Sequence, residues 1–306
     1  MADPRARVTP IIRRGTSDDI ETCHAILWET ATDLGRRQAT PLEGSLEDWW
    51  QTGEPFQRFL AAHAAEWWVA ANPASGELIG YARSIERGGL FELTEFFVRP
   101  GRQSRGLGED LLERAFPVGR GEVRSIIATG YPAAMGRYYR ADTVARFPFL
   151  TLARAPEAVE PDGLVHPTAL AKEHDPSGAI AAIERVVVGF PRTDAEVALL
   201  LEQREAYLYR RGGEVVGFAF VGPGGAGPIA ALDPADLPGI LRHVETRASA
   251  IGMESLELEV PSVNAVAVRH LLERGFRINP WINYFMSNRP FGQFDRFIGF
   301  SPPLFL

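Results

Sequence analysis

The stretch Val98-Arg-Pro-Gly-Arg-Gln103-Ser-Arg-Gly106-Leu-Gly108 decides how this sequence is interpreted. An apolar, strand-like run ends at Val98, a short polar loop follows, and a helical pattern begins near Leu107. The two glycines allow backbone N–H groups to converge beside the positive end of a helix, where side chains would obstruct an anion. Arg102 and Arg105 add positive charge. The loop is therefore expected to bind a diphosphate.

Helical and strand patterns alternate on both sides of this loop. The apolar spacing and the capping residues define each element. In chain order they predict a strand at 11–14, a helix from Thr16–Asp19 to about Leu34, a helix at 46–65, strands at 67–71, 78–85 and 90–98, a helix from Leu107, a strand at 123–128, and a helix that opens at Pro132. The first half is thus predicted to be an α/β mixture whose beginning is mostly antiparallel.

A segment rich in proline and acidic residues, 155–167, is predicted to be a linker, after which the same element order begins again. Since 306 residues fit two domains of about 150 residues, we predict tandem domains at 1–155 and 163–306, each a mixed, mostly antiparallel twisted sheet flanked by helices. The second set comprises strands at 164–170, 206–210, 215–221, 227–232, 255–260 and 281–286, and helices at 175–190, 194–203, 237–251 and 264–274.

The loop sequence also carries a family resemblance. Gln103-Ser104-Arg105-Gly106-Leu107-Gly108 matches Gln/Arg-x-x-Gly-x-Gly/Ala at every defined position, directly after an apolar strand. In this it resembles the GNAT superfamily of acyl-CoA-dependent N-acyltransferases, over about residues 11–155. The resemblance implies a V-shaped sheet with acetyl-CoA in its splayed cleft. The cofactor-binding residues that it implies are Phe96, Phe97, Val98, Gln103, Ser104, Arg105, Gly106, Leu107 and Gly108.

The second half resembles the same superfamily through a different motif. Asn264-x-x-Ala267 and Leu271-x-x-x-Gly275-Phe276 are similar to the late helix of the family and to the Gly-Phe pair that follows it. The diphosphate loop is replaced by Asp233-Pro-Ala-Asp236, whose carboxylates would repel a diphosphate. The second domain is therefore predicted to be degenerate and not to bind coenzyme A in the usual way.

The resemblance also implies a general base and an oxyanion donor. A glutamate eleven residues before the signature Gln matches Glu92, which is our candidate base. Glu95 is the runner-up; simple strand alternation places it on the opposite face, although the family's bulge in this strand could shift the alternation. The backbone N–H of Val98 is the implied oxyanion donor, and Phe97 and Val98 are implied to pair with the pantetheine arm as an added strand would.

For the general acid the resemblance implies a tyrosine four residues before a Gly-Phe pair. Asp142-Thr143 stands where that pair would be, so the alignment selects Tyr138. The departure from Gly-Phe leaves Tyr139 open as well. The second half has Leu271 at this position, which cannot donate a proton.

Composition limits the cofactors and the partners. The only cysteine is Cys23, so no disulfide forms within the chain, which suits the cytoplasm. A net charge of −7 argues against a nucleic-acid partner and favours cationic amines. The six histidines lack metal-ligand spacing, so we expect no metal. No uncharged stretch is long enough to span a bilayer, so we expect no membrane association.

The sequence therefore predicts a transferase that moves an acetyl group from acetyl-CoA to a small-molecule primary amine. The sequence leaves open which amine is acetylated, and it leaves open whether the protein forms a homodimer. A non-catalytic acyl-CoA sensor or scaffold is the main alternative. A second alternative, a hydrolase or dehydrogenase with affinity for a nucleotide, would use Gly222-Pro-Gly-Gly-Ala-Gly227. A strand pattern follows these glycines where a dinucleotide site needs a helix, so we interpret them as a hairpin turn.

Overall fold

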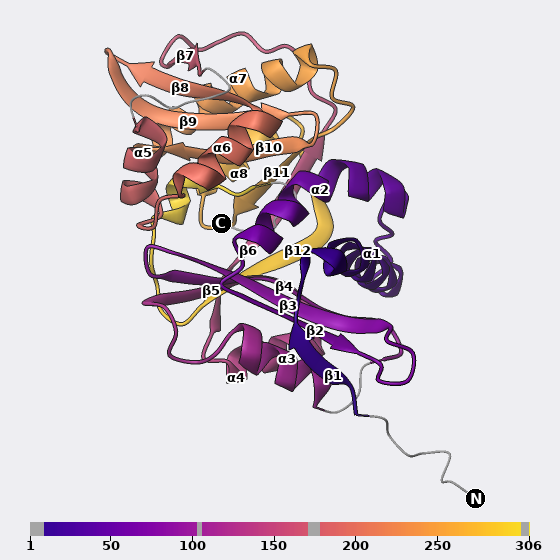
Figure 1. Ribbon diagram of the computed structural model, residues 1–306. Helices are drawn as coiled ribbons and strands as arrows, with labels where there is room; N and C mark the ends of the chain where they lie inside the picture. Colours follow the sequence, from indigo (N-terminus) through magenta and orange to yellow (C-terminus); the bar gives the residue numbers. More distant parts are fainter. Residues whose placement is uncertain (1–8, 103–105, 171–177, 301–305) are drawn as a thin grey trace, which may run out of the picture. The chain divides into compact units, whose positions relative to one another are not determined.

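The computed structural model describes residues 9–102, 106–170, 178–300 and 306. The chain divides into two compact units (Figure 1). Unit 1 comprises Met1–Glu86, Phe91–Arg124 and Tyr131–Asp142, and unit 2 comprises Arg87–Leu90, Ser125–Gly130 and Thr143–Leu306. The two halves of the chain that repeat one element order, 1–155 and 163–306, are called the first and the second repeat. The compact units do not coincide with them, because unit 2 also includes segments of the first repeat.

Unit 1 is a sheet in the order β1-β2-β3-β4 with helices on both faces. Helices α1 and α2 cover one face, and α3 and α4 lie on the other (Figure 1). The side chains of Cys23, Trp67 and Tyr81 fill the core under α1. The elements are β1 (Ile11–Arg14), α1 (Ile20–Arg37), α2 (Leu46–Ala62), β2 (Glu66–Ala71), β3 (Leu78–Arg87), β4 (Leu90–Val98), α3 (Leu107–Ala115) and α4 (Pro132–Arg140).

Local sequence accounts for where several of these helices begin. Ser45 accepts a hydrogen bond from the Asp48 amide, and the Asp48 carboxylate accepts one from the Ser45 amide, so α2 starts with a capping box. Pro132 opens α4 at a position where its missing N–H costs no hydrogen bond. Every element predicted before Arg140 is present, with ends that differ by a few residues.

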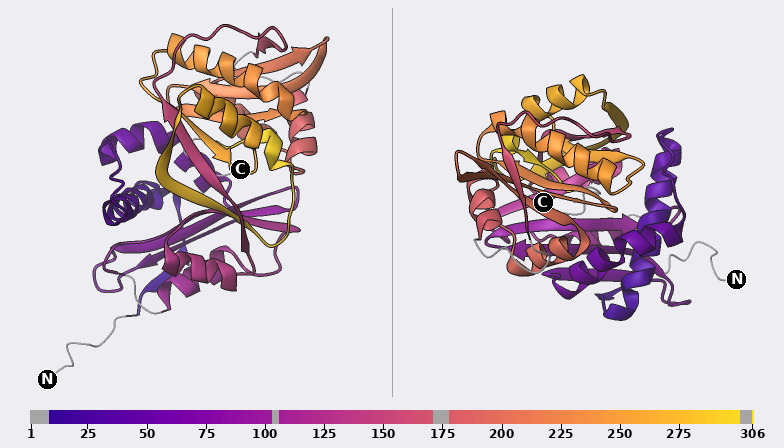
Figure 2. Two further views of the ribbon diagram at one scale, coloured as in Figure 1. Left: turned by 180° about the vertical axis from the view of Figure 1, so that it is seen from behind. Right: turned by 90° about the horizontal axis from the view of Figure 1, so that it is seen from above.

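Unit 2 holds two strand arrays. One runs in the order β5-β12-β6-β11 and the other in the order β13-β10-β9-β8-β7. Helices α5 and α6 cover one face of the second array, while α7 and α8 lie side by side on the other (Figures 1 and 2). The elements are β5 (Val123–Thr129), β6 (Val144–Arg154), β7 (His166–Ala169), α5 (Ala179–Val187), α6 (Asp194–Gln203), β8 (Glu205–Arg211), β9 (Glu214–Gly222), β10 (Gly225–Ala231), α7 (Leu237–Ala250), β11 (Leu256–Pro261), α8 (Ala265–Glu273), β12 (Arg277–Ser287) and β13 (Phe297–Ile298).

The two sequence repeats exchange a strand within unit 2. Strand β12, from the second repeat, lies between β5 and β6 of the first, and β6 lies between β12 and β11. Both neighbours of β12 are antiparallel to it, with Tyr284 opposite Ala128 of β5 and also opposite Pro148 of β6. The second repeat therefore supplies a strand without which β5 and β6 would have no common neighbour.

Strand β6 was missing from the sequence prediction, which ended the first half at a helix. Pro148 interrupts the strand pattern of this segment, and proline usually disfavours an interior strand. Pairing with β12 on one side and β11 on the other stabilises the strand here, with register shifts on the β12 side. Long-range pairing thus overrides a local signal.

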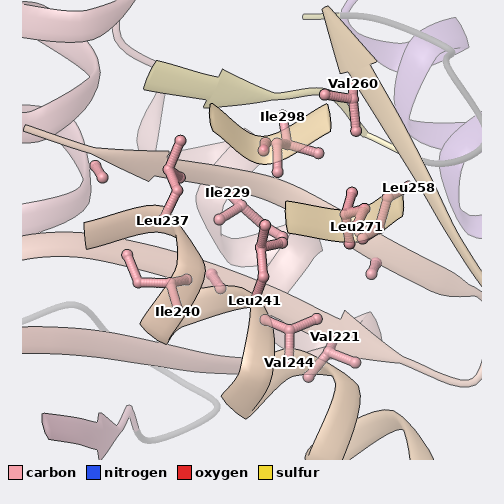
Figure 3. Close-up of a cluster of buried hydrophobic side chains, with 14 of the residues drawn as sticks. Val221, Ile229, Leu237, Ile240, Leu241, Val244, Leu258, Val260, Leu271 and Ile298 are labelled. Atoms are coloured by element: carbon pink, nitrogen blue, oxygen red, sulfur yellow. The ribbon is translucent and has the colours of Figure 1, made fainter. Parts of the chain in front are cut away.

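The core of unit 2 lies between the sheet and α7 (Figure 3). Leu237, Ile240, Leu241 and Val244 line one face of α7, as the helical spacing predicts, and all are buried. They meet Ile229 and other apolar side chains of β9, β10 and β11. Among the described residues, no helix combines the length and the apolar character that crossing a membrane requires.

The segment that follows β12 folds back onto unit 2. Phe294 packs against Phe147 of β6 and Phe285 of β12, with ring centroids 5.1 and 4.9 Å apart. Strand β13, which the sequence analysis did not predict, then pairs antiparallel with β10. The run from Gly222 to Gly227 spans a hairpin, as predicted: β9 ends at Gly222, Pro223 and Gly224 form the turn, and β10 begins at Gly225.

The exchanged strands make Phe285 a test of stability. Its side chain is 1% exposed and contacts Phe147 of β6, whereas Ile278 on the same strand is 44% exposed. We expect Phe285→Ala to lower the free energy of unfolding by about 3–5 kcal/mol, measured by urea denaturation. Ile278→Ala is the matched control and should change it by about 1 kcal/mol or less. Equal effects of the two variants would mean that the β6–β12 pairing is not central to folding.

Candidate functional site

The end of β4 presents backbone groups on the side away from β3. The Arg99 N–H donates to the Ile79 carbonyl of β3 at 2.9 Å. Because successive residues of a strand direct their N–H groups to alternate sides, the N–H groups of Val98 and Phe96 point away from β3. The N–H groups that the sequence analysis assigns to the oxyanion and the pantetheine arm therefore point to the side of β4 that β3 does not use.

A glycine on β3 permits this arrangement. A Cβ on Gly80 would lie 2.9 Å from the Phe97 carbonyl oxygen and 3.3 Å from the Val98 Cα. The two backbones therefore approach more closely here than any side chain would allow. Gly80 fixes the position of the last residues of β4, which are the ones predicted to contact the cofactor.

Helix α3 begins directly after the predicted diphosphate loop. Gly106 is its N-cap, with φ of +100°, and no side chain caps the helix among the described residues. The first N–H groups of an α-helix have no acceptor within the helix and carry partial positive charge. Only Gly106, Leu107 and Gly108 of the loop motif can be placed. Gln103, Ser104 and Arg105 lie outside the described residues.

The two motif glycines have different roles. A Cβ on Gly106 would meet nothing within 4 Å, so this glycine is needed for its positive φ. A Cβ on Gly108 would lie 3.3 Å from the Phe96 ring and 3.2 Å from Arg137 Nε, so this glycine allows α3 to pack against β4 and α4. Leu107 between them is buried in the core. Its side chain anchors the helix, which leaves its backbone for a ligand.

The two candidate tyrosines lie in different environments. Tyr138 is 6% exposed and its ring meets that of Phe96 edge-on, with centroids 6.1 Å apart, whereas Tyr139 is 51% exposed. Burial raises the pKa of Tyr138 above its ordinary value. Tyr138 therefore stays protonated at neutral pH, as a proton donor must, and it lies beside the end of β4.

The backbone supports the alignment that selected Tyr138. Asp142, which replaces the family glycine, has φ of +61°, the left-handed conformation that glycine favours, and Gly275 after α8 has φ of +85°. The Asp142 N–H donates to the carbonyl of Tyr139, and the Gly275 N–H donates to that of Leu272. Counting back from these residues makes Leu271 the counterpart of Tyr138.

Comparison with known proteins agrees with this arrangement. Residues 21–140 match the family model described as the acetyltransferase (GNAT) family. The first half of the chain carries a GNAT domain.

Solved structures extend the likeness to the whole chain. A putative acetyltransferase from Pyrococcus horikoshii covers 97% of this chain over 96% of its own, with a TM-score of 0.73 and 16% identity. A GCN5-related N-acetyltransferase from Sphaerobacter thermophilus covers 92% of this chain over 96% of its own, with a TM-score of 0.62 and 14% identity. A tandem GNAT protein of the clavulanic acid biosynthesis pathway covers 92% of this chain over 98% of its own, with a TM-score of 0.53 and 16% identity. The chain thus has a tandem GNAT fold. No curated protein sequence matches it.

Within the GNAT domain, Glu95 belongs to a buried polar cluster. Its carboxylate accepts hydrogen bonds from Gln57 Nε2 at 2.8 Å, Tyr81 Oη at 3.0 Å and Arg83 Nε at 2.5 Å. Arg83 Nη2 also donates to Gln57 Oε1 at 2.6 Å. These hydrogen bonds engage both carboxylate oxygens of Glu95, which is 2% exposed, so little of the carboxylate is left to meet an incoming amine. This disfavours Glu95 as the base.

Strand β4 contains an irregularity that sequence parity did not include. Phe91 stacks on Phe116 at the end of α3, with centroids 5.5 Å apart, and Phe96 lies against α3 and α4. Residues five apart on a regular strand face opposite ways, so β4 has an extra residue between these two. Simple alternation therefore does not separate the faces of Glu92 and Glu95. Glu92, the candidate base, is 1% exposed.

The only thiol of the GNAT domain is buried. Cys23 lies on α1 in the core with Trp67 and Tyr81, and burial raises its pKa to about 12. A protonated, inaccessible thiol is a poor nucleophile. Its neighbour His24 is also buried, beside the Trp50 ring at 5.2 Å, and within the part of the chain that the structure describes neither of its ring nitrogens has a hydrogen-bond partner. Sequence reasoning considered His24 only as a metal ligand, and no pattern marked it otherwise.

The Glu95 cluster can be tested by stability. Glu95→Gln should lower the free energy of unfolding by about 3–5 kcal/mol, because it leaves the Arg83 guanidinium buried without its counter-charge. Glu54→Gln, which breaks the exposed pair with Arg58, is the control and should change it by about 0.5 kcal/mol or less. Chemical denaturation measures both. An unchanged stability in Glu95→Gln, together with loss of turnover, would instead indicate that Glu95 is a catalytic base.

Proposed function

We propose that this chain is an N-acetyltransferase that moves an acetyl group from acetyl-CoA to a primary amine, by direct attack in a ternary complex. One observation carries the proposal. The uncapped start of α3 at Gly106 follows directly on a strand whose last N–H groups point away from β3. A diphosphate and a thioester linked by an extended arm need these two features next to each other.

The chain's own groups would divide the work as follows. The amides at Gly106, Leu107 and Gly108 bind the diphosphate, together with the predicted contacts from residues 103–105. The last residues of β4, Phe96, Phe97 and Val98, align the pantetheine arm. The Val98 N–H donates to the thioester oxygen as negative charge develops there, where a fixed donor lowers the barrier.

Two proton transfers complete the reaction. An amine with a pKa near 10.4 must lose a proton before it can attack, and Glu92 is the proposed base. The departing thiolate needs a proton, and Tyr138 is the proposed acid because its ring lies against Phe96 near the end of β4. Direct attack is preferred over an acetyl-enzyme because the thiol of Cys23 is buried and protonated. The proposed acceptor is a small-molecule amine, and we place the reaction in the cytoplasm.

Binding and turnover should be measured together. We expect acetyl-CoA to bind in isothermal titration and at least one primary amine of a diverse library to release coenzyme A, detected as free thiol. Gly106→Glu should weaken acetyl-CoA binding by at least about tenfold, which corresponds to about 1.4 kcal/mol, because it places a carboxylate at the diphosphate site.

Gly119→Glu is the matched control and should bind acetyl-CoA normally. It introduces the same charge at another glycine of positive φ whose added Cβ would have free space. Binding without release of coenzyme A from any amine would favour the alternative of a non-catalytic sensor. Affinity that survives Gly106→Glu would contradict the proposed site.

The two tyrosines give a second test. Tyr138→Phe should lower kcat by about 100-fold or more, since it removes the proton donor, and should leave acetyl-CoA binding unchanged. Tyr139→Phe should retain nearly full activity, because Tyr139 is half exposed to solvent. The reverse pattern would assign the acid to Tyr139. Steady-state kinetics with the amine found in the screen measures both variants.

A further inference from the structure

The two repeats make matching backbone contacts at the strand that ends before the diphosphate loop, or before its counterpart. In the first repeat, the residue after β4, Arg99, donates to Ile79, and a Cβ on Gly80 would lie 2.9 Å from the Phe97 carbonyl. In the second, the residue after β10, Leu232, donates to Val216 at 2.7 Å, and a Cβ on Gly217 would lie 2.7 Å from the Ala230 carbonyl.

These contacts align the two strands without reference to sequence identity. Ala231 is the counterpart of Val98, Ala230 of Phe97 and Ile229 of Phe96. Because Leu232 donates to β9, the N–H groups of Ala231 and Ile229 point away from β9. This edge of β10 therefore corresponds to the edge of β4 that the proposed function assigns to the pantetheine arm.

Strand β13 already lies along this edge. Ile298 is opposite Ile229 and Phe297 is opposite Ala230, in antiparallel register. The next residue, Gly299, donates its N–H to the Glu259 carbonyl of β11 at 2.7 Å. The segment 297–299 thus joins β10 to β11.

Further contacts fix this segment in place. Asn264 Nδ2, at the N-cap of α8, donates to the Phe297 carbonyl at 3.1 Å, and Arg296 Nη1 donates to the Leu232 carbonyl at 2.7 Å. Gly227 and Gly299 approach so closely that a Cβ on Gly227 would collide with the Gly299 carbonyl. The side chains of Phe294, Phe297, Ile298 and Phe300 are all buried.

In the loop after β10, a side chain of the loop itself accepts a hydrogen bond from a loop amide. Asp233 Oδ1 accepts a hydrogen bond from the Ala235 amide at 3.0 Å, so a side chain of the loop caps a backbone donor there. Asp236 is buried and pairs with Arg211 at 3.0 Å. Asp233 caps the 3-10 turn Pro234–Asp236 that leads into α7, whereas among the described residues no side chain caps the start of α3. The second repeat thus provides its own anion where the first is proposed to bind a diphosphate.

We propose that the second repeat keeps a strand-addition groove, the counterpart of the proposed cofactor groove on β4, and that strand β13 of the same chain fills it. The groove takes an extended, apolar peptide with glycine where the segment crosses to β11, and not a nucleotide. The chain therefore binds at most one acetyl-CoA. The filled groove stands on the contacts of unit 2, whereas its comparison with β4 rests on the proposed function.

The test cuts the chain without first removing the segment. A protease site inserted between Asn288 and Gly292 is cleaved in the folded protein, and the nicked protein is passed over a gel-filtration column at nanomolar concentration. We expect the fragment that contains β13 to stay bound. An excess of synthetic peptide of residues 292–306 should displace it, with a fluorescent label on the fragment as the readout.

Peptide variants make the test specific. Ile298→Asp should compete at least about tenfold more weakly, because it buries a carboxylate in the core, and Gly299→Val should be weakened too, because a Cβ there would lie 3.0 Å from the Phe149 ring. Asp295→Asn is the control, since Asp295 is exposed, and should compete as the unmodified peptide does.

Two results would overturn the proposal. One is loss of the fragment on the column, and the other is equal competition by the Ile298→Asp and Asp295→Asn peptides. Titration of acetyl-CoA into the intact and the nicked protein distinguishes the two proposals. Failure of the proposed function would abolish binding in both proteins without affecting fragment retention, whereas a second acetyl-CoA site appearing after peptide removal would overturn only the exclusion of nucleotide.

Discussion

The pairing of β6 with β12 is the constraint on which the rest of unit 2 depends. Each strand belongs to one sequence repeat and lies against a strand of the other, so neither repeat can complete its own array of strands. Phenylalanine rings from both strands, Phe147 and Phe285, stack 5.0 Å apart, and Phe294 closes over them. The second repeat thus supplies a strand and part of the core around it, a structural role that does not depend on binding a cofactor.

The two repeats share backbone contacts but differ in the side chains that a reaction would use. Gly80 and Gly217 allow the same close approach of two strands, and Asp142 and Gly275 end corresponding helices with positive φ. The side chains then differ at each position that chemistry would use: Leu271 stands for Tyr138, and Asp233 caps the loop amides itself. The fold of the second repeat thus persists although its chemistry has been replaced.

Within the GNAT domain, the polar residues of β4 have structural as well as proposed catalytic roles. Glu95 is buried and accepts hydrogen bonds from three side chains of α2 and β3, so it links these elements. The bulge in β4 explains how two glutamates three residues apart need not face opposite sides. The proposed base and acid, Glu92 and Tyr138, are both buried, Glu92 on β4 itself and Tyr138 against Phe96 of that strand.

Local sequence patterns were enough to predict the order of the elements up to Arg140, the glycine loop before α3, and the lack of a comparable loop and tyrosine in the second repeat. These are local features, written in apolar spacing, capping residues and glycines. Only the tertiary structure decided the exchange of β6 and β12, the bulge in β4, the partners of Glu95 and the place of β13. Strand partners and register come from contacts between residues far apart in the chain, and no local pattern specifies them.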